Sequence, residues 1–339
     1  MIIDTDSITE KSNKGWISLL KGINSFKKTN QTPTDAYQNM ISLHCKTDGI
    51  VTDLIHEMLQ KEDLFELNTK HSIFPNYDKA SLNKHHKNIN SNSFSIFDEK
   101  IPDSLLLQVH EFALSHPCRV DGHRDKEIIF EPENCLTGAH RFDEKKLVET
   151  ELFQQLMTEP LFVNMASTYL QCTPTLCSVN LWWSPASKGS PSSESAQLYH
   201  FDMSRAKWIN VFIYITDVDT ESGPHCVVKG SHKIDGKRQK LLNRGYARIS
   251  DEEMNEVYGS EEIKELTGQA GTIIFEDTKA FHKGKKPTKD NRLIFELSFA
   301  SSLFGGEYQN IEIPEHLLNP DVKKVLSEQR DIYSRYEIS

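Results

Sequence analysis

Apolar residues in the first half of the chain recur with the period of an α-helix in three segments. These are residues 35–67, 102–117 and 145–170, where aliphatic and aromatic side chains stand three or four positions apart. Between the first two, residues 81–95 are rich in Asn, Ser, Lys and His, which is typical of a loop or linker. The pattern predicts that the first hundred residues are helical and irregular, and that more helices follow up to Leu170.

The pattern changes after Pro174, where short runs rich in Val, Ile, Phe, Tyr and Trp are separated by Gly, Pro, Ser and Asp. Short strands with turn signals between them predict an antiparallel sandwich or barrel. The predicted strands are Leu176–Trp183, Ala196–Phe201, Trp208–Val218, Cys226–Lys229, Gly271–Glu276 and Arg292–Ser301. Residues 235–268 read as a polar, partly helical insert, and residues 321–336 as a helix packed on the outside. The loop Ser184–Ser195 is expected to be mobile and is a candidate lid.

A His-x-Asp pair, His200 and Asp202, stands at the end of the second of these strands. Residues two apart on an extended chain point to the same face, so both side chains can reach one point. His282 follows a later strand and is the candidate for a third ligand. Two His and one carboxylate on one face of an octahedral metal form the facial triad of non-haem Fe(II) oxygenases. The open positions suit 2-oxoglutarate, which takes two of them, and O₂, which takes the third.

Arg292 opens the last predicted strand, ten residues after His282. Residues 287–291 are rich in turn formers, and a hairpin there would bring Arg292 back beside His282. The planar guanidinium can bind the distal carboxylate of 2-oxoglutarate through two hydrogen bonds. A structural ion pair is the other interpretation of this residue.

Taken in order, His200–Asp202, the segment Gly223–Lys233, His282 and Arg292 resemble the phytanoyl-CoA dioxygenase family. The resemblance covers roughly residues 174–305, and it is specific because these motifs occur together; His-x-Asp alone is a weak signal. It implies an α+β fold with a double-stranded β-helix core, of the jelly-roll or cupin type, and flanking helices. It also implies that His200, Asp202 and His282 bind Fe(II), that Arg292 binds 2-oxoglutarate, and that O₂ is consumed.

One position departs from the family pattern. Several members carry a hydroxyl residue two positions after the distal His, where this chain has Gly284. Thr272, Thr278 and Ser298 are candidates to supply the missing contact. Halogenase relatives replace the carboxylate ligand by a small residue, so Asp202 favours hydroxylation, desaturation or ring closure over halogenation.

Composition and charge narrow the class of partner. The chain has 339 residues, 37% hydrophobic and 26% charged, with a formal net charge of −10, which is ordinary for a globular protein and argues against broad binding to nucleic acid or anionic membrane. The six cysteines are scattered without a C-x-x-C pair, and there is no signal peptide or apolar run long enough to span a bilayer. We therefore expect reduced thiols and a cytoplasmic location. The sequence leaves the oligomeric state open.

Several other residues have two interpretations. His232 is a rival ligand, and His225 stands at a turn; both are expected to be structural. Asn180 and Trp182 share one face of a strand, which allows either to reach the site or to lie in the core. Arg141 can bind a substrate carboxylate, although a surface position is favoured.

We expect three regions: residues 1–100 as a helical extension, 101–310 as the catalytic domain with its insert at 235–268, and 311–339 as a helical tail. The expected activity is hydroxylation or another oxidation of an unactivated C–H bond in a small organic molecule, with 2-oxoglutarate converted to succinate. A protein or peptide hydroxylase is one alternative and requires an open groove. A non-catalytic cupin-like binding module and a zinc or manganese site are two more. The combination of a complete triad with Arg292 disfavours the last two.

Overall fold

The computed structural model describes residues 5–61, 64–69, 72–74, 76–188, 190–191, 193 and 195–339. The helices are α1 (Thr5–Thr29), α2 (Thr34–Lys46), α3 (Ile50–Leu59), α4 (Lys79–Asn92), α5 (Asp103–Ser115), α6 (Glu144–Val148), α7 (Glu151–Met157), α8 (Pro160–Leu170), α9 (Gly236–Leu242), α10 (Asp251–Tyr258) and α11 (Pro320–Glu328). The strands are β1 (Phe94–Ile96), β2 (Pro117–Val120), β3 (His123–Ile129), β4 (His140–Arg141), β5 (Thr175–Ser184), β6 (Trp208–Tyr214), β7 (His225–Val228), β8 (Ile263–Leu266), β9 (Ile273–Glu276), β10 (His282–Gly284), β11 (Arg292–Ala300), β12 (Ile311–Ile313) and β13 (Tyr336–Ile338).

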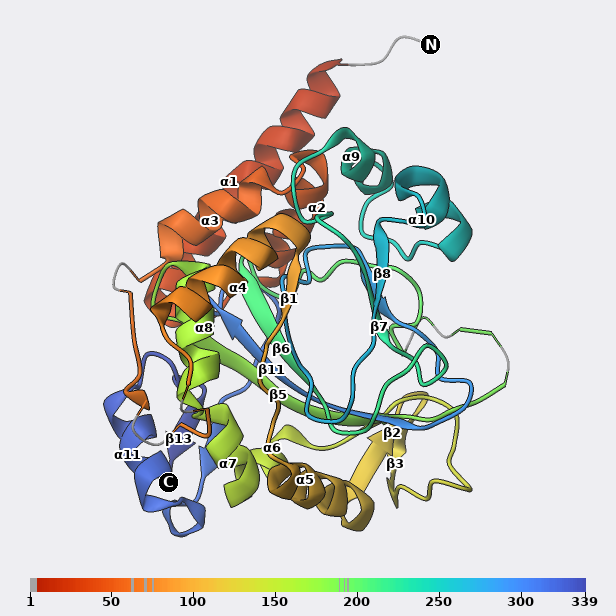
Figure 1. The fold of residues 1–339 in the computed structure, drawn as a ribbon. Helices are drawn as coiled ribbons and strands as arrows, with labels where there is room; N and C mark the ends of the chain where they lie inside the picture. The colour runs from red at the N-terminus through yellow and green to blue at the C-terminus, as the bar shows by residue number, and fades with distance from the viewer. Residues whose placement is uncertain are drawn as a thin grey trace.

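Two antiparallel sheets form the core of the fold. The larger has eight strands in the order β1-β9-β6-β11-β5-β4-β2-β3, and the smaller has three in the order β10-β7-β8. Figure 1 shows β7 and β8 across from the middle of the larger sheet. Apolar side chains pack between them, including Tyr214 and Ile294 from the larger sheet and Val227 and Leu266 from the smaller one. This is the predicted double layer of antiparallel strands.

Strand β11 shows why each face of the larger sheet has its own neighbours. Its odd-numbered residues, from Leu293 to Phe299, are all buried in the main hydrophobic core, which also takes residues from α5 to α8. Helices α4, α7 and α8 cover this outer side in Figure 1. The even-numbered residues Arg292, Ile294, Glu296 and Ser298 point the other way, toward the smaller sheet. Alternation along one strand therefore separates a core face from a face available for chemistry.

Residues 79–92 form helix α4, so the prediction of a loop or linker over residues 81–95 is wrong. Asp78 caps the helix by accepting a hydrogen bond from the Ser81 N–H at 2.8 Å. Leu82, His85 and Ile89, three and four positions apart, are buried against the core. Since the rest of the helix is polar and one of its three buried residues is a His, composition concealed the helical period.

Two other segments differ from their predictions. Residues 196–201 make only isolated bridges, Tyr199 with Ile249 and His200 with His282, in place of a regular strand. In the tail the helix ends at Glu328, and residues 336–338 form β13, parallel to β12. The insert at 235–268 is partly helical, as predicted, but it also supplies β8 to the smaller sheet.

Residues 189, 192 and 194 of the candidate lid lie outside the described residues. Across the part of the chain that the structure describes, every helix is too short or too polar to cross a bilayer.

Candidate metal centre

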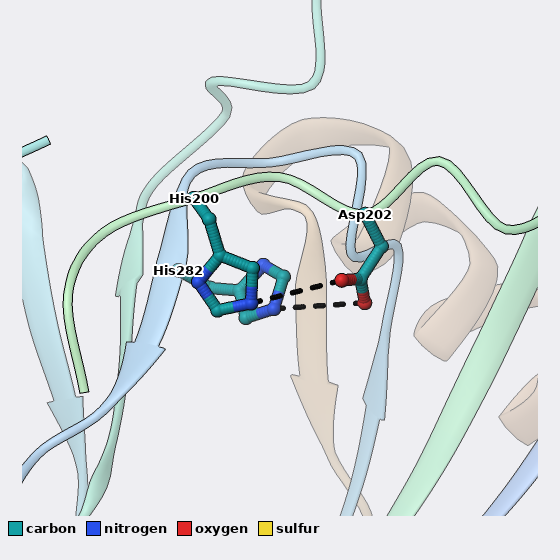
Figure 2. Close-up of side chains that lie close together, drawn as sticks. All are labelled: His200, Asp202 and His282. Carbon is teal, nitrogen blue, oxygen red and sulfur yellow. Dashed lines mark ion pairs between the residues drawn. The ribbon is translucent and has the colours of Figure 1, made fainter. Parts of the chain in front are cut away.

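His200, Asp202 and His282 come together at one point between the two sheets (Figure 2). The Nε2 atom of His200 lies 3.7 Å from Oδ1 of Asp202, and that of His282 lies 3.7 Å from Oδ2. The two imidazole rings are 4.4 Å apart between centroids. Both histidines are buried, whereas the Asp202 side chain is 33% exposed. The three residues that the sequence pattern singled out therefore form one cluster, open on the side of the carboxylate.

Backbone hydrogen bonds hold the ligand-bearing segments in register. The His200 N–H donates to the His282 carbonyl at 3.0 Å, and the His282 N–H donates back to the His200 carbonyl at 2.8 Å. The Asp202 N–H donates to the Thr278 carbonyl at 2.8 Å. A short antiparallel bridge thus joins two residues that are 82 positions apart in sequence and holds their segments side by side.

Each imidazole is also held in one tautomer. Nδ1 of His200 donates to the Leu198 carbonyl at 2.9 Å, and Nδ1 of His282 donates to the Ala280 carbonyl at 3.0 Å. The proton therefore lies on Nδ1, and the lone pair of Nε2 faces the other ligands. Burial, reinforced by the neighbouring His282, lowers the pKa of His200, which keeps this imidazole neutral. A neutral imidazole is the form that binds a metal.

The donor set fits a divalent transition metal. Atoms bound to one ion at right angles, with bonds of about 2.1 Å, lie about 3 Å apart; here the donor atoms lie within 4.8 Å of one another. Among the described residues, no other cluster of three or more His, Cys, Asp or Glu side chains is close enough to hold a metal. His232, the rival ligand, is outside this cluster and interacts with the charges of Asp277 and Lys279.

Arg292 lies buried at the start of β11, beside the end of β10 that is distal to His282. Its Nη2 donates to Oγ of Ser184 at 3.1 Å, and its Nη1 donates to the Gly223 carbonyl. Its Nε is buried and has no hydrogen-bond partner among the described residues. A buried guanidinium with an unused donor fits an anionic ligand, because an unpaired buried donor is costly.

Gly284 stands next to this guanidinium, where several family members carry a hydroxyl residue. A Cβ at position 284 would lie 3.2 Å from Nη2 of Arg292, closer than ordinary van der Waals contact. The hydroxyl that contacts Arg292 belongs instead to Ser184, its cross-strand neighbour on β5. Of the three candidates from the sequence, Thr278 is engaged by the Trp208 indole at 2.7 Å.

Two further residues lie beside the cluster: His225, which the sequence analysis expected to be structural, and Glu276, which it did not single out. His225 begins β7 and is buried, with its ring stacked on His282 at 5.3 Å and 18°. Its Nε2 lies 2.7 Å from Oε2 of the fully buried Glu276. Burial raises the pKa of Glu276 to about 8 and lowers the pKa of His225 to about 3, so at neutral pH the proton stays on the carboxyl group. The signal in the sequence was the position of Glu276 at the end of a strand otherwise made of apolar residues.

The sequence analysis also missed Glu296, another carboxylate in a largely apolar strand. It pairs across the sheet with Asn180 on β5 and with Phe212 on β6, on the same face as Arg292. Asn180 and Trp182 do lie on this inner face, whereas Trp183 is core and stacks on Phe130 at 4.5 Å. Counting back in twos from Ser298 or forward from Arg292 would have placed Glu296 there.

Arg141 lies at the rim of this face. Its guanidinium is 5.5 Å from the centroid of the Trp182 ring and forms an ion pair with Asp121 at 3.1 Å. The side chain is 44% exposed, which agrees with the favoured surface position.

An antiparallel double sheet that holds two His and one carboxylate beside a buried Arg is the arrangement of a non-haem, 2-oxoglutarate-dependent oxygenase. The sequence profile of the family described as Phytanoyl-CoA dioxygenase (PhyH) matches residues 48–292, and the chain belongs to this family. It is an α+β protein with the double-stranded β-helix core of these enzymes, a 2-oxoglutarate-dependent dioxygenase that uses Fe(II), 2-oxoglutarate and O₂. The resemblance found in the sequence is thereby confirmed.

Solved structures give weaker likenesses. The non-haem α-ketoglutarate-dependent epimerase SnoN from nogalamycin biosynthesis has a TM-score of 0.45 at 14% identity, covering 66% of this chain and 84% of its own. EctD from S. alaskensis, in its apoform, has a TM-score of 0.46 at 14% identity, covering 71% and 82%. HygX from Streptomyces hygroscopicus, with nickel and 2-oxoglutarate bound, has a TM-score of 0.45 at 13% identity, covering 73% and 94%. A search of curated protein sequences gave no match. The identification therefore rests on the family profile and the site.

Proposed function

We propose that this dioxygenase hydroxylates, or otherwise oxidises, an unactivated C–H bond of a small organic molecule. In this proposal His200, Asp202 and His282 hold the iron, and Arg292 binds the distal carboxylate of 2-oxoglutarate. The observation that carries it is the position of Arg292 relative to the triad. His282 and Gly284 are two residues apart on β10, so they are separated by about 6.5 Å, and the guanidinium lies against Gly284. That spacing is about the length of a five-carbon diacid.

The residues of the chain have separate tasks in this proposal. When bound, Fe(II) and 2-oxoglutarate supply the oxidising power, with release of CO₂ and succinate. His200, Asp202 and His282 would hold the metal through three donors, and a metal with open positions would bind the co-substrate and O₂ there. Arg292 would orient the diacid, and the apolar cluster between the sheets, which includes Tyr214, Ile274 and Ile294, would exclude water and strengthen the ion pair.

The experiment that tests this proposal is an anaerobic absorption titration of metal-free protein with Fe(II) and then 2-oxoglutarate. We expect a visible metal-to-ligand charge-transfer band that requires both additions. His200→Ala should abolish the band, whereas His316→Ala, which removes an exposed His far along the chain, should leave it intact. Arg292→Met should keep iron binding but raise the half-saturating 2-oxoglutarate concentration roughly 10- to 100-fold, because a hydrogen bond to a charged group is lost.

A folded, iron-loaded protein that gave no band with 2-oxoglutarate would contradict the proposal. A band of equal strength in His200→Ala would contradict the assignment of that ligand. Release of succinate on addition of O₂ provides the second readout, and a screen of small molecules for stimulation of that release identifies the substrate.

Two further expectations belong to the same proposal. We propose a cytoplasmic location, supported by six free cysteines, five of them buried. We also keep the division into residues 1–100, 101–310 and 311–339 as a proposal. Truncation at each boundary, followed by a measurement of folding, tests it.

A further inference from the structure

The inner face of the larger sheet carries a group of polar side chains below the metal cluster. Glu296 lies on β11, with Asn180 opposite it on β5. Asn210 on β6 lies opposite Glu276 on β9 and next to Ser298 on β11. The charge of Asp202 acts on both Glu296 and Glu276, which places this group near the metal ligands. We call these four residues, Asn180, Asn210, Glu276 and Glu296, the polar floor.

Glu296 has no hydrogen-bond donor and no ion-pair partner within the described part of the chain. It is partly exposed, as are its neighbours Asn180 and Trp182, although the adjacent residues on β11 are fully buried. The side chain of Asp202 is also partly exposed. Glu296 and Asp202 are therefore both accessible to solvent, and the charge of Asp202 acts on Glu296, so a substrate bound beside Asp202 would lie near Glu296.

The polar floor presents acceptors in excess of donors. Oδ1 of Asn210 and Oε1 of Glu276 are buried without a hydrogen-bond partner among the described residues, whereas Oε2 of Glu276 lies 2.7 Å from Nε2 of His225. One amide N–H of Asn180 donates to Oγ of Ser178 at 3.1 Å. Arg141, at the rim of this face, is already paired with Asp121, and Arg248 is a second cation, close enough to act on His200. A ligand that fits this surface donates hydrogen bonds, because buried acceptors left unpaired are costly.

We propose that Glu296 is a substrate-anchoring residue, and that the substrate is a small organic cation whose ammonium or guanidinium nitrogen pairs with it. Desolvation between the neighbouring strands, and next the charge of Asp202, raise the pKa of Glu296 to about 8, so at neutral pH its carboxyl group is charged only when a positive charge lies beside it. A long acyl chain would leave the acceptors unpaired, and an anionic substrate would be repelled by Asp202. This inference rests on the proposed function, since it assumes that the substrate enters beside the iron ligands.

A matched series of probes tests the charge preference without turnover. Pentylamine, pentanol and pentanoate share one five-carbon chain and differ in the charge of the terminal group. Their dissociation constants are measured by ligand-observed NMR on the full-length protein loaded with Zn(II) and 2-oxoglutarate. We expect pentylamine to bind about tenfold more tightly than pentanol, and pentanoate to bind most weakly.

Two variants separate anchoring from general electrostatics. Glu296→Gln keeps the shape of the side chain and should bring pentylamine and pentanol to within about twofold of each other. Glu312→Gln removes an exposed carboxylate on β12 and should leave the preference unchanged. A thermal unfolding curve for each variant confirms that the fold is intact.

The inference is overturned if the unmutated protein binds none of the probes, if it shows no preference for the amine, or if Glu296→Gln retains that preference. The charge-transfer band with Fe(II) and 2-oxoglutarate distinguishes failure of this inference from failure of the proposed function. A band in the unmutated protein and in Glu296→Gln, with no preference for the amine, refutes this inference alone. Absence of the band from the unmutated protein refutes the proposed function itself.

Discussion

Gly284 stands where several family members carry a hydroxyl residue, and the nearby guanidinium of Arg292 leaves little room for a side chain at this position. A side chain there would press on Nη2 of Arg292, which is already held by Ser184 on its other side. We expect Gly284→Ser to weaken 2-oxoglutarate binding by about tenfold, or ~1.4 kcal/mol, through displacement of the guanidinium. Titration of the charge-transfer band measures this effect. Ser184→Ala is the companion variant, and a gain in affinity for Gly284→Ser would show that the family's hydroxyl can be restored here.

His44 gives a prediction on pH dependence. Its Nδ1 donates to Oγ1 of Thr52 at 3.1 Å, and its Nε2 accepts from Nη2 of Arg238 at 2.8 Å. Burial, and next the charge of Arg238, lower the pKa of His44 well below its ordinary 6.5. The folded state therefore requires neutral His44, and its contribution to stability is complete above pH 6.5 and is lost as the pH falls below that value.

The corresponding variant is His44→Gln, whose amide can accept from Arg238 and donate to Thr52. Between about pH 6 and pH 5, we expect the free energy of unfolding of the unmutated protein to fall more steeply, by up to ~1.4 kcal/mol per pH unit, than that of the variant. Urea unfolding at several pH values measures both slopes. His316→Gln, at an exposed position, should behave as the unmutated protein. Equal slopes for His44→Gln and the unmutated protein would contradict the argument.

At the scale of elements, helix α9 supports the metal centre from behind through Arg238. This guanidinium is buried between the rings of Phe201 and Phe281, 5.6 Å from each centroid. Phe201 stands between His200 and Asp202, and Phe281 directly precedes His282. Arg238 also donates to Oδ1 of Asp48 at 2.9 Å, which attaches the end of α2 to the same network.

We expect Arg238→Met to lower the free energy of unfolding by ~3–5 kcal/mol, because it leaves the buried Asp48 without its partner. Iron affinity should fall as well, since the backs of both ligand segments lose their support. Urea unfolding of the metal-free protein measures the first effect. Arg244 directly follows the C-cap of α9 and forms an exposed ion pair with Glu253; Arg244→Met should cost less than about 1 kcal/mol. A cost that small for Arg238→Met would mean that the network is not structural.

The sequence predicted the long central strands and most of the helices, but it missed the shorter strands and one helix. The outer face of β5, β6, β9 and β11 carries large apolar residues at alternate positions, which no loop would carry. The strands β1, β2, β3, β4, β8, β10, β12 and β13 were not predicted, and the predicted strand at residues 196–201 forms isolated bridges only. Helix α4 buries only Leu82, His85 and Ile89 and was mistaken for a loop. His200, Asp202 and His282, which the structure brings into one cluster, were singled out because the His-x-Asp pair and the family motif mark them. Glu276, Glu296 and Ser184 were not singled out, because a polar residue of a strand can be assigned to the inner face only from a neighbour of known orientation, as Arg292 would have allowed for Glu296.

At the scale of the whole molecule, regions far from the site belong to the same core. Tyr333, in the tail, is 1% exposed and packs in the main core cluster together with residues of β11 and α8. Its hydroxyl donates to the Met157 carbonyl at 3.2 Å. Strand β1, near the other end, pairs with β9 at the edge of the larger sheet.

We expect Tyr333→Ala to lower the free energy of unfolding by ~3–5 kcal/mol, as for other large aromatic residues removed from a core. Leu317→Ala, at a 38% exposed position in the same tail, should cost less than about 1 kcal/mol. Denaturant unfolding of the two variants gives the comparison. Similar small costs for both would show that the tail is an appendage of the fold.

The antiparallel bridge between His200 and His282 also has a consequence for how the protein acquires its metal in a cell. Because backbone hydrogen bonds of the folded chain position both imidazoles, a metal ion binds to a preformed site. Folding therefore does not depend on which metal is bound. Nickel and zinc bind such nitrogen and oxygen donors more tightly than iron does. Protein produced in zinc-rich medium is therefore expected to be folded, mismetallated and inactive, and to regain activity after chelation and reloading with iron. The metal content of the protein is then set by the metals available where it folds.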